Sequence, residues 1–391
     1  MEKTKFKSLN IILLVGILLV AANLRAPLTA VGSLVKLISG DLGLTSVESG
    51  LITTIPLLCF AIISPFAPKL AAKFSMEKSV FVSLVVLLIG IIVRSLNTWS
   101  TLLCGTILIG CSIAVCNVLL PGLIKKEFFQ KSGLVTGIYS VSMNLSGAIA
   151  SGISFPLATS LGIGWTRALG IWAILSAVAC LGWLPQLKRK DIIKETQHSE
   201  NNKNIWGSGL AWCVTIFMGL QSLIFYVLIA WLPAILLESG ISATKSGIFL
   251  SIIQLTMLPV SFFIPILSEK KKNQRYLVAF TAILILVGII IIFSKIDFLI
   301  LFAMLCLGIG CGSAFGLSMI FFSLRTSSVR EASELSGMAQ SVGYLFASTG
   351  PLLFGALHDW THSWNLSLEI LMGLILILLF TGYFAGSDRK L

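Results

Sequence analysis

The residue with the most demanding chemistry in this sequence is Arg25, which lies inside a long apolar segment, residues 9–38. An arginine at the depth of a bilayer costs between about 2.5 and 17 kcal/mol, depending on the reference state. The guanidinium keeps its proton, so it cannot avoid this cost by becoming neutral. Arg25 therefore requires either a cavity in which it meets an anionic or strongly dipolar solute, or a structural partner such as helix carbonyl groups or a glutamate of another helix.

Helical spacing indicates which residues lie beside Arg25. Thr29 and Gly32 follow it at helical intervals and form a small, polar stripe that suits a cavity. Asn23 lies two residues away, which is about 200° around a helix, so we expect it to hydrogen-bond a neighbouring helix. Pro27 frees the carbonyl of Asn23, because a proline inside a helix has no N–H to donate. We predict that Arg25 and Thr29 bind a solute.

Amide and phenol side chains in other apolar segments are further candidates. Gln340 and Tyr344 lie on one helix face, and such groups can donate and accept hydrogen bonds. We expect Tyr139 to share its face with Ser146, and Asn144 to point elsewhere. For each candidate, the alternative is a hydrogen bond between helices. The predicted solute-binding residues are Arg25, Thr29, Asn117, Tyr139, Gln221, Tyr226, Gln340 and Tyr344.

Acidic residues are scarce at bilayer depth. Proton-coupled carriers usually keep an Asp or Glu there, but here Glu369 is the acidic residue that lies at least partly inside an apolar segment. We predict that any coupling to protons runs through the solute or through Glu369. The alternative is facilitated diffusion or exchange.

The cysteines and histidines do not form a catalytic or metal-binding pattern. All eight cysteines fall in apolar segments without a CxxC spacing, which favours a packing role. We expect His198, His358 and His362 in loops or at the surface. No nucleophile–base pair or metal-ligand set can be assembled from these residues. We therefore expect no enzyme activity, no catalytic residue, no metal and no cofactor.

Composition identifies an integral membrane protein. The 391 residues are 56% hydrophobic and 11% charged, the mean hydropathy is +0.98, and soluble domains carry about 25% charged residues. A membrane-spanning helix needs about 20 mainly apolar residues. Twelve such segments are predicted, at 9–38, 46–72, 79–97, 99–122, 132–158, 165–187, 209–237, 244–269, 275–294, 298–324, 333–357 and 364–386.

The distribution of positive charge predicts the orientation. With the N-terminus in the cytoplasm, the inner segments carry 22 Lys and Arg residues and the outer segments carry 5, with Arg25 within the membrane. Positive charge is concentrated on the cytoplasmic side of membrane proteins, so both termini are predicted to be cytoplasmic. The net charge of +12 is explained by the inner membrane surface, and no nucleic-acid partner is expected.

The chain is predicted to consist of two similar halves. Residues 1–187 form a six-helix bundle, residues 188–208 a cytoplasmic linker, and residues 209–391 a second six-helix bundle. Ser49-Gly50 recurs as Ser246-Gly247 at an offset of 197 residues, and Gly110-Cys111 recurs as Gly310-Cys311 at an offset of 200. Such an all-α arrangement of two parallel repeats, with the pathway at the interface between them, is the major facilitator architecture.

Several motifs resemble those of the cyanate permease and 2-nitroimidazole transporter family of the major facilitator superfamily. They are residues 23–27 (NLRAP), 117–121 (NVLLP), 219–222 (GLQS), 225–226 (FY), 231–233 (WLP) and 335–344 (LSGMAQSVGY). The resemblance covers nearly the whole chain but does not specify one solute, because the family carries unlike small molecules. The acidic loop signature of the superfamily is degenerate here, since residues 67–73 (APKLAAK) contain no Asp.

The sequence therefore predicts a secondary active or facilitative transporter in the cytoplasmic membrane. Its expected partners are a small anionic or polar solute, such as a cyanate-like anion, and the lipid bilayer, and a monomer is expected to suffice. The main alternative is an efflux carrier for neutral nitro-heterocycles or other drugs. A membrane-embedded enzyme or a sensor is disfavoured, because the loops are too short to form a soluble domain.

Overall fold

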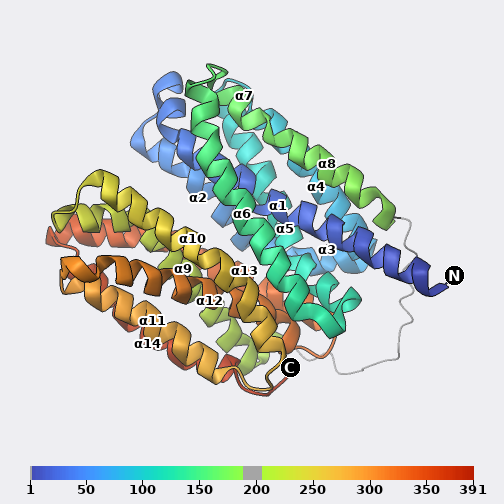
Figure 1. Ribbon diagram of the computed structural model, residues 1–391. Helices are drawn as coiled ribbons and strands as arrows, with labels where there is room; N and C mark the ends of the chain where they lie inside the picture. Colours follow the sequence, from blue (N-terminus) through green and yellow to red (C-terminus); the bar gives the residue numbers. More distant parts are fainter. Residues whose placement is uncertain (1, 188–204) are drawn as a thin grey trace. The chain divides into compact units, whose positions relative to one another are not determined.

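The computed structural model of the protein describes residues 2–187 and 205–391, and every regular element among them is a helix (Figure 1). The contacts between described residues divide the chain into two units. Unit 1 holds α1 to α8 except for residues 130–137, and unit 2 holds residues 130–137 together with the chain from Ile205 onward. Most of the predicted linker, residues 188–204, lies outside the described residues, and the predicted domain boundaries stay a prediction.

The helices of unit 1 follow the predicted segments, with two interruptions. They are α1 (Glu2–Leu42), α2 (Ser46–Ile63), α3 (Ala67–Phe74), α4 (Met76–Arg94), α5 (Trp99–Glu127), α6 (Ser132–Thr159), α7 (Gly164–Gly170) and α8 (Trp172–Leu187). The segments predicted at 46–72 and 165–187 are each two helices. A 3-10 turn at Ser64–Phe66 separates α2 from α3, where two closely spaced prolines, Pro65 and Pro68, remove N–H donors.

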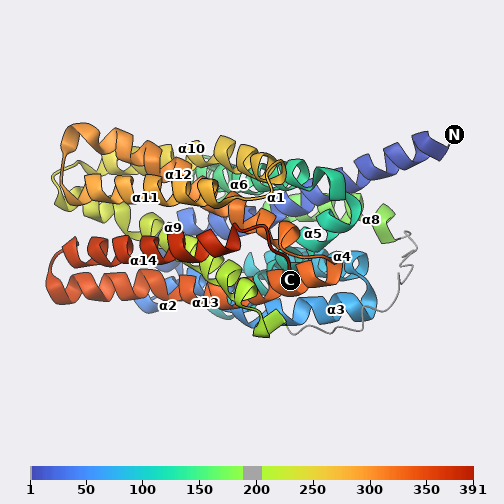
Figure 2. The same ribbon diagram turned by 90° about the horizontal axis from the view of Figure 1, so that it is seen from below.

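Unit 2 contains six long helices. They are α9 (Gly209–Glu238), α10 (Ala243–Glu269), α11 (Arg275–Phe293), α12 (Ile300–Leu324), α13 (Val329–Thr361) and α14 (Asn365–Ala385). In Figures 1 and 2, α11 and α14 lie side by side. Pro27 was expected to free the carbonyl of Asn23, and α1 continues through it; α5 and α9 likewise continue through Pro121 and Pro233.

Eleven helical stretches among the described residues are long and apolar enough to cross a membrane. The one predicted segment that is not among these stretches, 333–357, lies within α13, which is an uninterrupted helix of 33 residues. α13 is long enough to span a bilayer, but residues such as Ser336, Gln340 and Ser341 make it too polar to be counted by composition. The prediction of an all-α membrane protein is confirmed.

Glycines allow close helix packing within unit 2. Gly308, Gly312 and Gly316 follow each other at intervals of four residues along α12, where it crosses α10. A Cβ added at Gly308 would lie 2.8 Å from the carbonyl oxygen of Ile253, and one at Gly312 would lie 3.0 Å from Cα of Met257. Small residues at this spacing let two helix backbones approach closely in a membrane, where packing rather than hydrophobicity drives helix association.

In unit 1, a partly buried ion pair and a hydrogen bond together join three helices. Glu77 at the start of α4 is 4% exposed, and its carboxylate accepts from Nζ of Lys126 in α5 at 2.9 Å. The indole of Trp183 in α8 donates to the main-chain carbonyl of Glu77 at 2.9 Å. Residues 67–73 contain no Asp, but Glu77, nine residues beyond Pro68, forms an ion pair close to them in the sequence.

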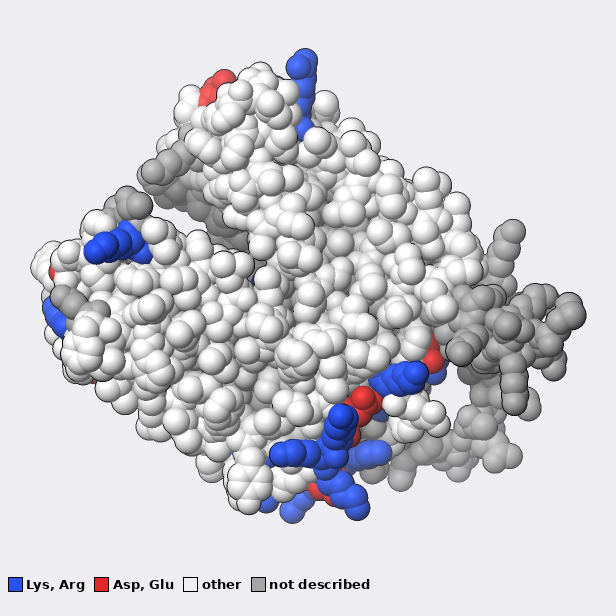
Figure 3. All heavy atoms as spheres, in the orientation of Figure 1, with Lys and Arg blue, Asp and Glu red and all other residues white. Residues whose placement is uncertain are grey.

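Charged side chains avoid the flanks of the helices. Figure 3 shows a broad surface that carries almost no Lys, Arg, Asp or Glu, with the charged side chains gathered at its margins. Large apolar side chains are exposed on several helices, as Ile62 in α2, Leu181 in α8 and Phe380 in α14 show. This arrangement fits a surface solvated by lipid rather than by water.

Candidate functional site

One face of α1 is joined to α6 by four hydrogen bonds. The α1 residues Leu18, Ala22, Arg25 and Thr29 are spaced at one helix face, and each provides one atom. Ser142 and Ser146 donate to the carbonyl oxygens of Leu18 and Ala22 at 2.9 and 2.8 Å. Arg25 donates through Nη1 to Oδ1 of Asn144 at 2.8 Å, and Thr29 donates to the carbonyl oxygen of Gly147 at 2.8 Å. Arg25 and Thr29 are therefore brought together, as predicted, beside α6.

The partner of Arg25 in this bond is a neutral amide, which differs from the helix carbonyl or glutamate considered from sequence. The expectation that Asn144 points elsewhere was wrong, because the face of α6 that contacts α1 includes it. Since the oxygen of the amide accepts from Arg25, its NH2 group points away from the guanidinium. That Nδ2 atom is buried and has no hydrogen-bond partner among the described residues. Asn144 is the main residue of this cluster that the sequence analysis missed.

Local packing leaves Arg25 and Thr29 half-buried in unit 1. A Cβ added at Gly147 would lie 3.2 Å from Cβ and 3.4 Å from Cδ of Arg25, so the glycine makes room for the arginine side chain. Arg25 also lies near the middle of the apolar span Ile11–Val35. The acidic residues of α1 to α8 all lie near helix ends; they are Glu2, Asp41, Glu48, Glu77 and Glu127.

A second polar contact in unit 1 joins α5 to α6. The hydroxyl of Tyr139 lies 3.4 Å from Oδ1 of Asn117, and both side chains are buried. Asn117 lies four residues before Pro121 in α5, so its carbonyl receives no intrahelical hydrogen bond from that proline. Asn23 points away from Arg25, as predicted. It donates to the carbonyl oxygen of Leu175 in α8 at 3.3 Å and to that of Leu19 at 2.8 Å.

In unit 2, the predicted glutamines are buried and bond to hydroxyl groups. Nε2 of Gln221 lies 2.6 Å from Oγ of Ser222, and Nε2 of Gln340 lies 2.8 Å from Oγ of Ser336, one turn earlier in α13. The predicted tyrosines are partly exposed in this unit; Tyr226 packs edge-on against Phe225 at 5.6 Å between ring centroids. Tyr344 lies one turn beyond Gln340 on α13. These helices thus offer neutral hydrogen-bonding groups.

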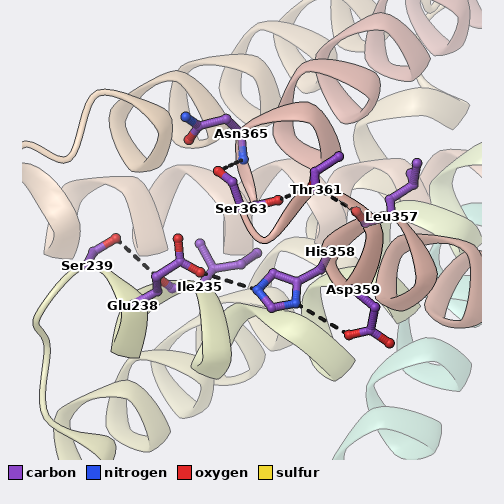
Figure 4. A network of polar contacts seen from close by, with 9 residues as sticks. All are labelled: Ile235, Glu238, Ser239, Leu357, His358, Asp359, Thr361, Ser363 and Asn365. Atoms are coloured by element: carbon purple, nitrogen blue, oxygen red, sulfur yellow. Dashed lines mark hydrogen bonds and ion pairs between the residues drawn. The ribbon is translucent and has the colours of Figure 1, made fainter.

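The remaining titratable residues of unit 2 lie apart from these groups. Glu369 lies in the second turn of α14 and is exposed, and its role in coupling stays a prediction. Figure 4 shows the imidazole of His358 between Glu238 and Asp359. His358 Nε2 lies 3.4 Å from Glu238 Oε2, and its ring stacks on Trp364 at 4.2 Å. Its place is therefore the last turns of α13 rather than a loop.

Metal-ligand chemistry has no counterpart in this arrangement. Within residues 2–187 and 205–391, no group of three or more His, Cys, Asp or Glu side chains is placed to hold a metal ion. The side chains that come together offer instead a guanidinium, carboxamides and hydroxyls. Such groups suit reversible binding of a small polar or anionic solute by hydrogen bonds.

Comparisons with known proteins give consistent likenesses along the whole chain. A family model described as Major Facilitator Superfamily matches residues 13–351. The chain is 41% identical over 378 residues to the uncharacterized transporter YycB of Bacillus subtilis, covering 96% of this chain and 94% of the relative. It is 39% identical over 383 residues to the 2-nitroimidazole transporter of Escherichia coli, covering 98% and 97%.

Two more distant likenesses point the same way. The cyanate transport protein CynX of Escherichia coli is 26% identical over 373 residues, covering 94% of this chain and 96% of the relative. Among solved structures, the fucose:proton symporter FucP of Escherichia coli aligns with a TM-score of 0.75 and 12% identity, covering 96% of this chain and 99% of that chain. At that identity the structural likeness concerns the fold alone.

Proposed function

Since the chain belongs to the Major Facilitator Superfamily, whose members are membrane transporters and not enzymes, we propose that it carries a small anionic or polar solute by alternating access. A cyanate-like monoanion is the solute class that we favour. The resemblance to the cyanate permease and 2-nitroimidazole transporter family that the sequence motifs indicated is confirmed by these relatives. The solute and the mechanism are the parts that this proposal adds.

The observation that carries the proposal is the arginine near the middle of the α1 span and its hydrogen bond to Asn144. The amide oxygen of Asn144 accepts from the guanidinium at 2.8 Å, and the amide itself adds no charge. The amide NH2 of the same residue points away from the guanidinium and is buried without a hydrogen-bond partner among the described residues. A monoanion at this place gains charge-assisted hydrogen bonds, which are roughly twice as strong as neutral ones.

The other candidates have supporting roles in this proposal. Thr29 holds the α1 backbone to α6 through the carbonyl of Gly147, so it fixes the distance between the two helices that bear Arg25 and Asn144. Asn117 and Tyr139 lie at the next polar contact of α6. Gln221, Tyr226, Gln340 and Tyr344 offer neutral hydrogen-bond donors and acceptors within unit 2.

A second solute class is favoured by one relative. The Escherichia coli protein that is 39% identical over nearly the whole chain is named a 2-nitroimidazole transporter. A neutral nitro-heterocycle needs hydrogen-bond donors for its nitro oxygens and aromatic surface for its ring, and the tyrosines and amides of the candidate set offer both. Such a solute depends less on the charge of Arg25 than an anion does.

The membrane setting completes the proposal. The bacterial relatives favour the cytoplasmic membrane, and the excess of Lys and Arg in the predicted inner segments favours cytoplasmic termini. We propose a monomer as the transporting form, because one chain of this fold contains both repeats.

The deciding experiment compares the thermal stabilisation of purified wild-type protein and Arg25→Gln by cyanate, nitrite and 4-hydroxybenzoate, and by uncharged 2-nitroimidazole. A bound ligand raises the melting temperature by mass action, so its concentration dependence gives the Kd. Arg167→Gln makes the same change at an exposed arginine of α7 and serves as the matched control.

We expect at least one anion to stabilise the wild type and Arg167→Gln, and to lose about tenfold or more in affinity in Arg25→Gln. If 2-nitroimidazole stabilises all three proteins equally and no anion stabilises any of them, the second solute class replaces the first. Equal stabilisation of wild type and Arg25→Gln by an anion would make Arg25 a structural residue.

A further inference from the structure

Unit 1 contains a second arginine, Arg94, which is more deeply buried than Arg25. Arg94 is the last residue of α4, and 1% of its surface is exposed. Its Nη1 donates to the main-chain carbonyl oxygen of Pro27 in α1 at 2.8 Å. From sequence this residue was one of the five Lys and Arg residues assigned to the outer side, and its burial was not predicted.

The charge of Arg94 has no acidic partner among the described residues. Its Nε and Nη2 atoms are buried without a hydrogen-bond partner there, and the ion pairs of the described residues do not include it. The helices are nonetheless packed closely at this position, because a Cβ added at Gly105 of α5 would overlap the main-chain nitrogen of Arg94. The glycine lets α5 close over the end of α4 at this arginine.

Arg325 of unit 2 shows how a buried arginine is otherwise accommodated. It is 2% exposed, and its guanidinium lies over the ring of Phe321 at 5.5 Å. Burial lowers the pKa of Arg325 to about 10, while the negative charge of Asp388 opposes that shift. Arg325 thus has a carboxylate in its vicinity and an aromatic face, whereas Arg94 has a backbone carbonyl.

We propose that Arg94 is a specificity-determining residue, a second buried cation that makes unit 1 select anionic over neutral solutes at Arg25. The proposal rests on the proposed function of Arg25. Arg94 of α4 bonds to the main-chain carbonyl of Pro27, two residues from Arg25, whereas the Arg25 side chain bonds to Asn144 of α6, so the two guanidinium groups contact different neighbouring elements. Arg94 therefore acts across the helix through its charge and does not touch the solute.

The size of this effect follows from the distance. A helix with its side chains is roughly 10 Å across, and two unit charges at that separation interact appreciably at the effective dielectric of a protein. The attraction corresponds to an increase of about tenfold in the affinity for a monoanion. An uncharged solute of similar size gains nothing from it. The hydrogen bond from Arg94 to the carbonyl of Pro27 holds the Arg94 guanidinium in place. The position of its positive charge relative to α1 is therefore fixed.

The test measures the Kd of the anion that best stabilises the wild type, chosen from cyanate, nitrite and 4-hydroxybenzoate, in Arg94→Gln and Arg94→Lys. The lysine variant keeps the charge, and the glutamine variant removes it. Arg325→Gln is the matched control, a buried arginine changed in unit 2. The ligand-free melting temperature and the Kd of uncharged 2-nitroimidazole report any merely structural effect of the same substitutions.

We expect Arg94→Gln to weaken anion binding about tenfold, Arg94→Lys to stay within about threefold of the wild type, and Arg325→Gln to leave the Kd unchanged. Binding of 2-nitroimidazole should be the same in all of them. The proposal is overturned if the lysine and glutamine variants weaken anion binding equally, or if the anion and the neutral heterocycle are affected alike.

The outcomes for the two arginines are separable. An anion whose binding depends on Arg25 but is unchanged in Arg94→Gln overturns this inference and leaves the proposed function intact. If no anion binds the wild type, both fail together. Should Arg94→Gln not fold, Arg94→Met removes the same charge with an apolar side chain, a change that buried charged sites often tolerate, and the comparison with Arg94→Lys is made in that pair.

Discussion

The two units of the molecule place polar groups of different character on related helices. In unit 1, the α1–α6 contact contains a cation, with Arg25 bonded to Asn144 at 2.8 Å. In unit 2, no charged residue occurs within 209–237 or 335–357, the central stretches of α9 and α13. The buried amides there bond to serine hydroxyls. The first long helices of the two units thus carry polar groups of different charge, the guanidinium of Arg25 in α1 and the amide of Gln221 in α9.

The helices also approach each other differently in the two units. At the α9–α13 contact, a Cβ added at Gly219 would lie 3.0 Å from Cα of Gly343, so two backbones touch directly. At the α1–α6 contact, the space beside Gly147 is occupied by the side chain of Arg25. Unit 2 has used its small residues for backbone packing, and unit 1 has used one to seat a cation. We infer that recognition of solute charge depends on unit 1 rather than on unit 2.

The sharpest way to break this comparison is to neutralise the cation in place. Asn144→Asp puts a carboxylate 2.8 Å from Nη1 of Arg25, and the ion pair should weaken anion binding roughly 100-fold, since hydrogen bonds to charged groups contribute about 1.5–3 kcal/mol. Gln221→Glu adds the same negative charge to α9 of unit 2, at a side chain that bonds to Ser222 instead of to an arginine. The Kd values of both variants for cyanate, from the concentration dependence of thermal stabilisation, make the test.

If the two units divide the task as inferred, Gln221→Glu weakens anion binding by no more than about tenfold. Equal losses in the two variants would show that the added charge acts by general repulsion, and the proposed difference between the units would be wrong.

The packing side of the comparison is tested by adding one methyl group to each contact. In Gly343→Ala the new Cβ lies 2.6 Å from Sδ of Met218 and 3.1 Å from Cα of Gly219, and a backbone cannot move aside easily. We expect unit 2 to lose about 1–3 kcal/mol of stability, which is typical of overpacking. In Gly147→Ala the nearest atom belongs to the side chain of Arg25, at 3.2 Å.

Gly147→Ala should therefore cost less stability than Gly343→Ala but shift Arg25 and weaken anion binding a few-fold. Melting temperatures of the two variants without ligand, and their Kd values for the chosen anion, provide both numbers. A larger stability loss in Gly147→Ala than in Gly343→Ala would reverse the assignment of packing to unit 2.

The fold was largely predictable because the signals for membrane helices extend over whole segments. Runs of about 20 apolar residues can hardly form anything but spanning helices in lipid, and the all-α class follows. The interruption at Ser64–Phe66 was missed, because the prolines there lie inside an apolar run whose length alone indicated one helix. In α13 the length of the helix was predicted although its composition is unusual. Its polar residues lower its hydropathy without interrupting the helix.

The candidate site was less predictable, because it depends on which helices become neighbours. Spacing along α1 correctly separated Asn23 from Arg25, since that relation is set within one helix. The pairing of Arg25 with Asn144 joins residues 119 positions apart, and no periodicity contains it. Arg94 was missed for the same reason, as its burial depends on Gly105 of another helix.

The contribution of unit 2 is sharpened by removing one of its amides. Gln340→Leu loses the bond to Ser336 at 2.8 Å and any hydrogen bond to a solute. Because the lost group is neutral, we expect cyanate and 2-nitroimidazole to lose affinity to a similar extent, by roughly three- to tenfold, as a hydrogen bond contributes about 0.5–1.5 kcal/mol. Kd values for both ligands give the result, and a loss confined to cyanate would mean that unit 2 also reads charge.

The smallest expected effect concerns the histidine network at the end of unit 2. His358 and Glu238 join α13 to α9 at 3.4 Å, with side chains 32% and 39% exposed. Partly exposed ion pairs contribute about 1 kcal/mol or less, because solvent screens them. We expect His358→Ala to lower the melting temperature slightly, through the lost stacking on Trp364 at 4.2 Å as well as the lost pair. A double-mutant cycle with Glu238→Gln separates the two contributions, since the coupling energy contains only the pair. Anion affinity should be unchanged in every member of the cycle, because these residues belong to α9 and α13 and not to α1 and α6. A change in the Kd would show that the end of unit 2 takes part in charge recognition.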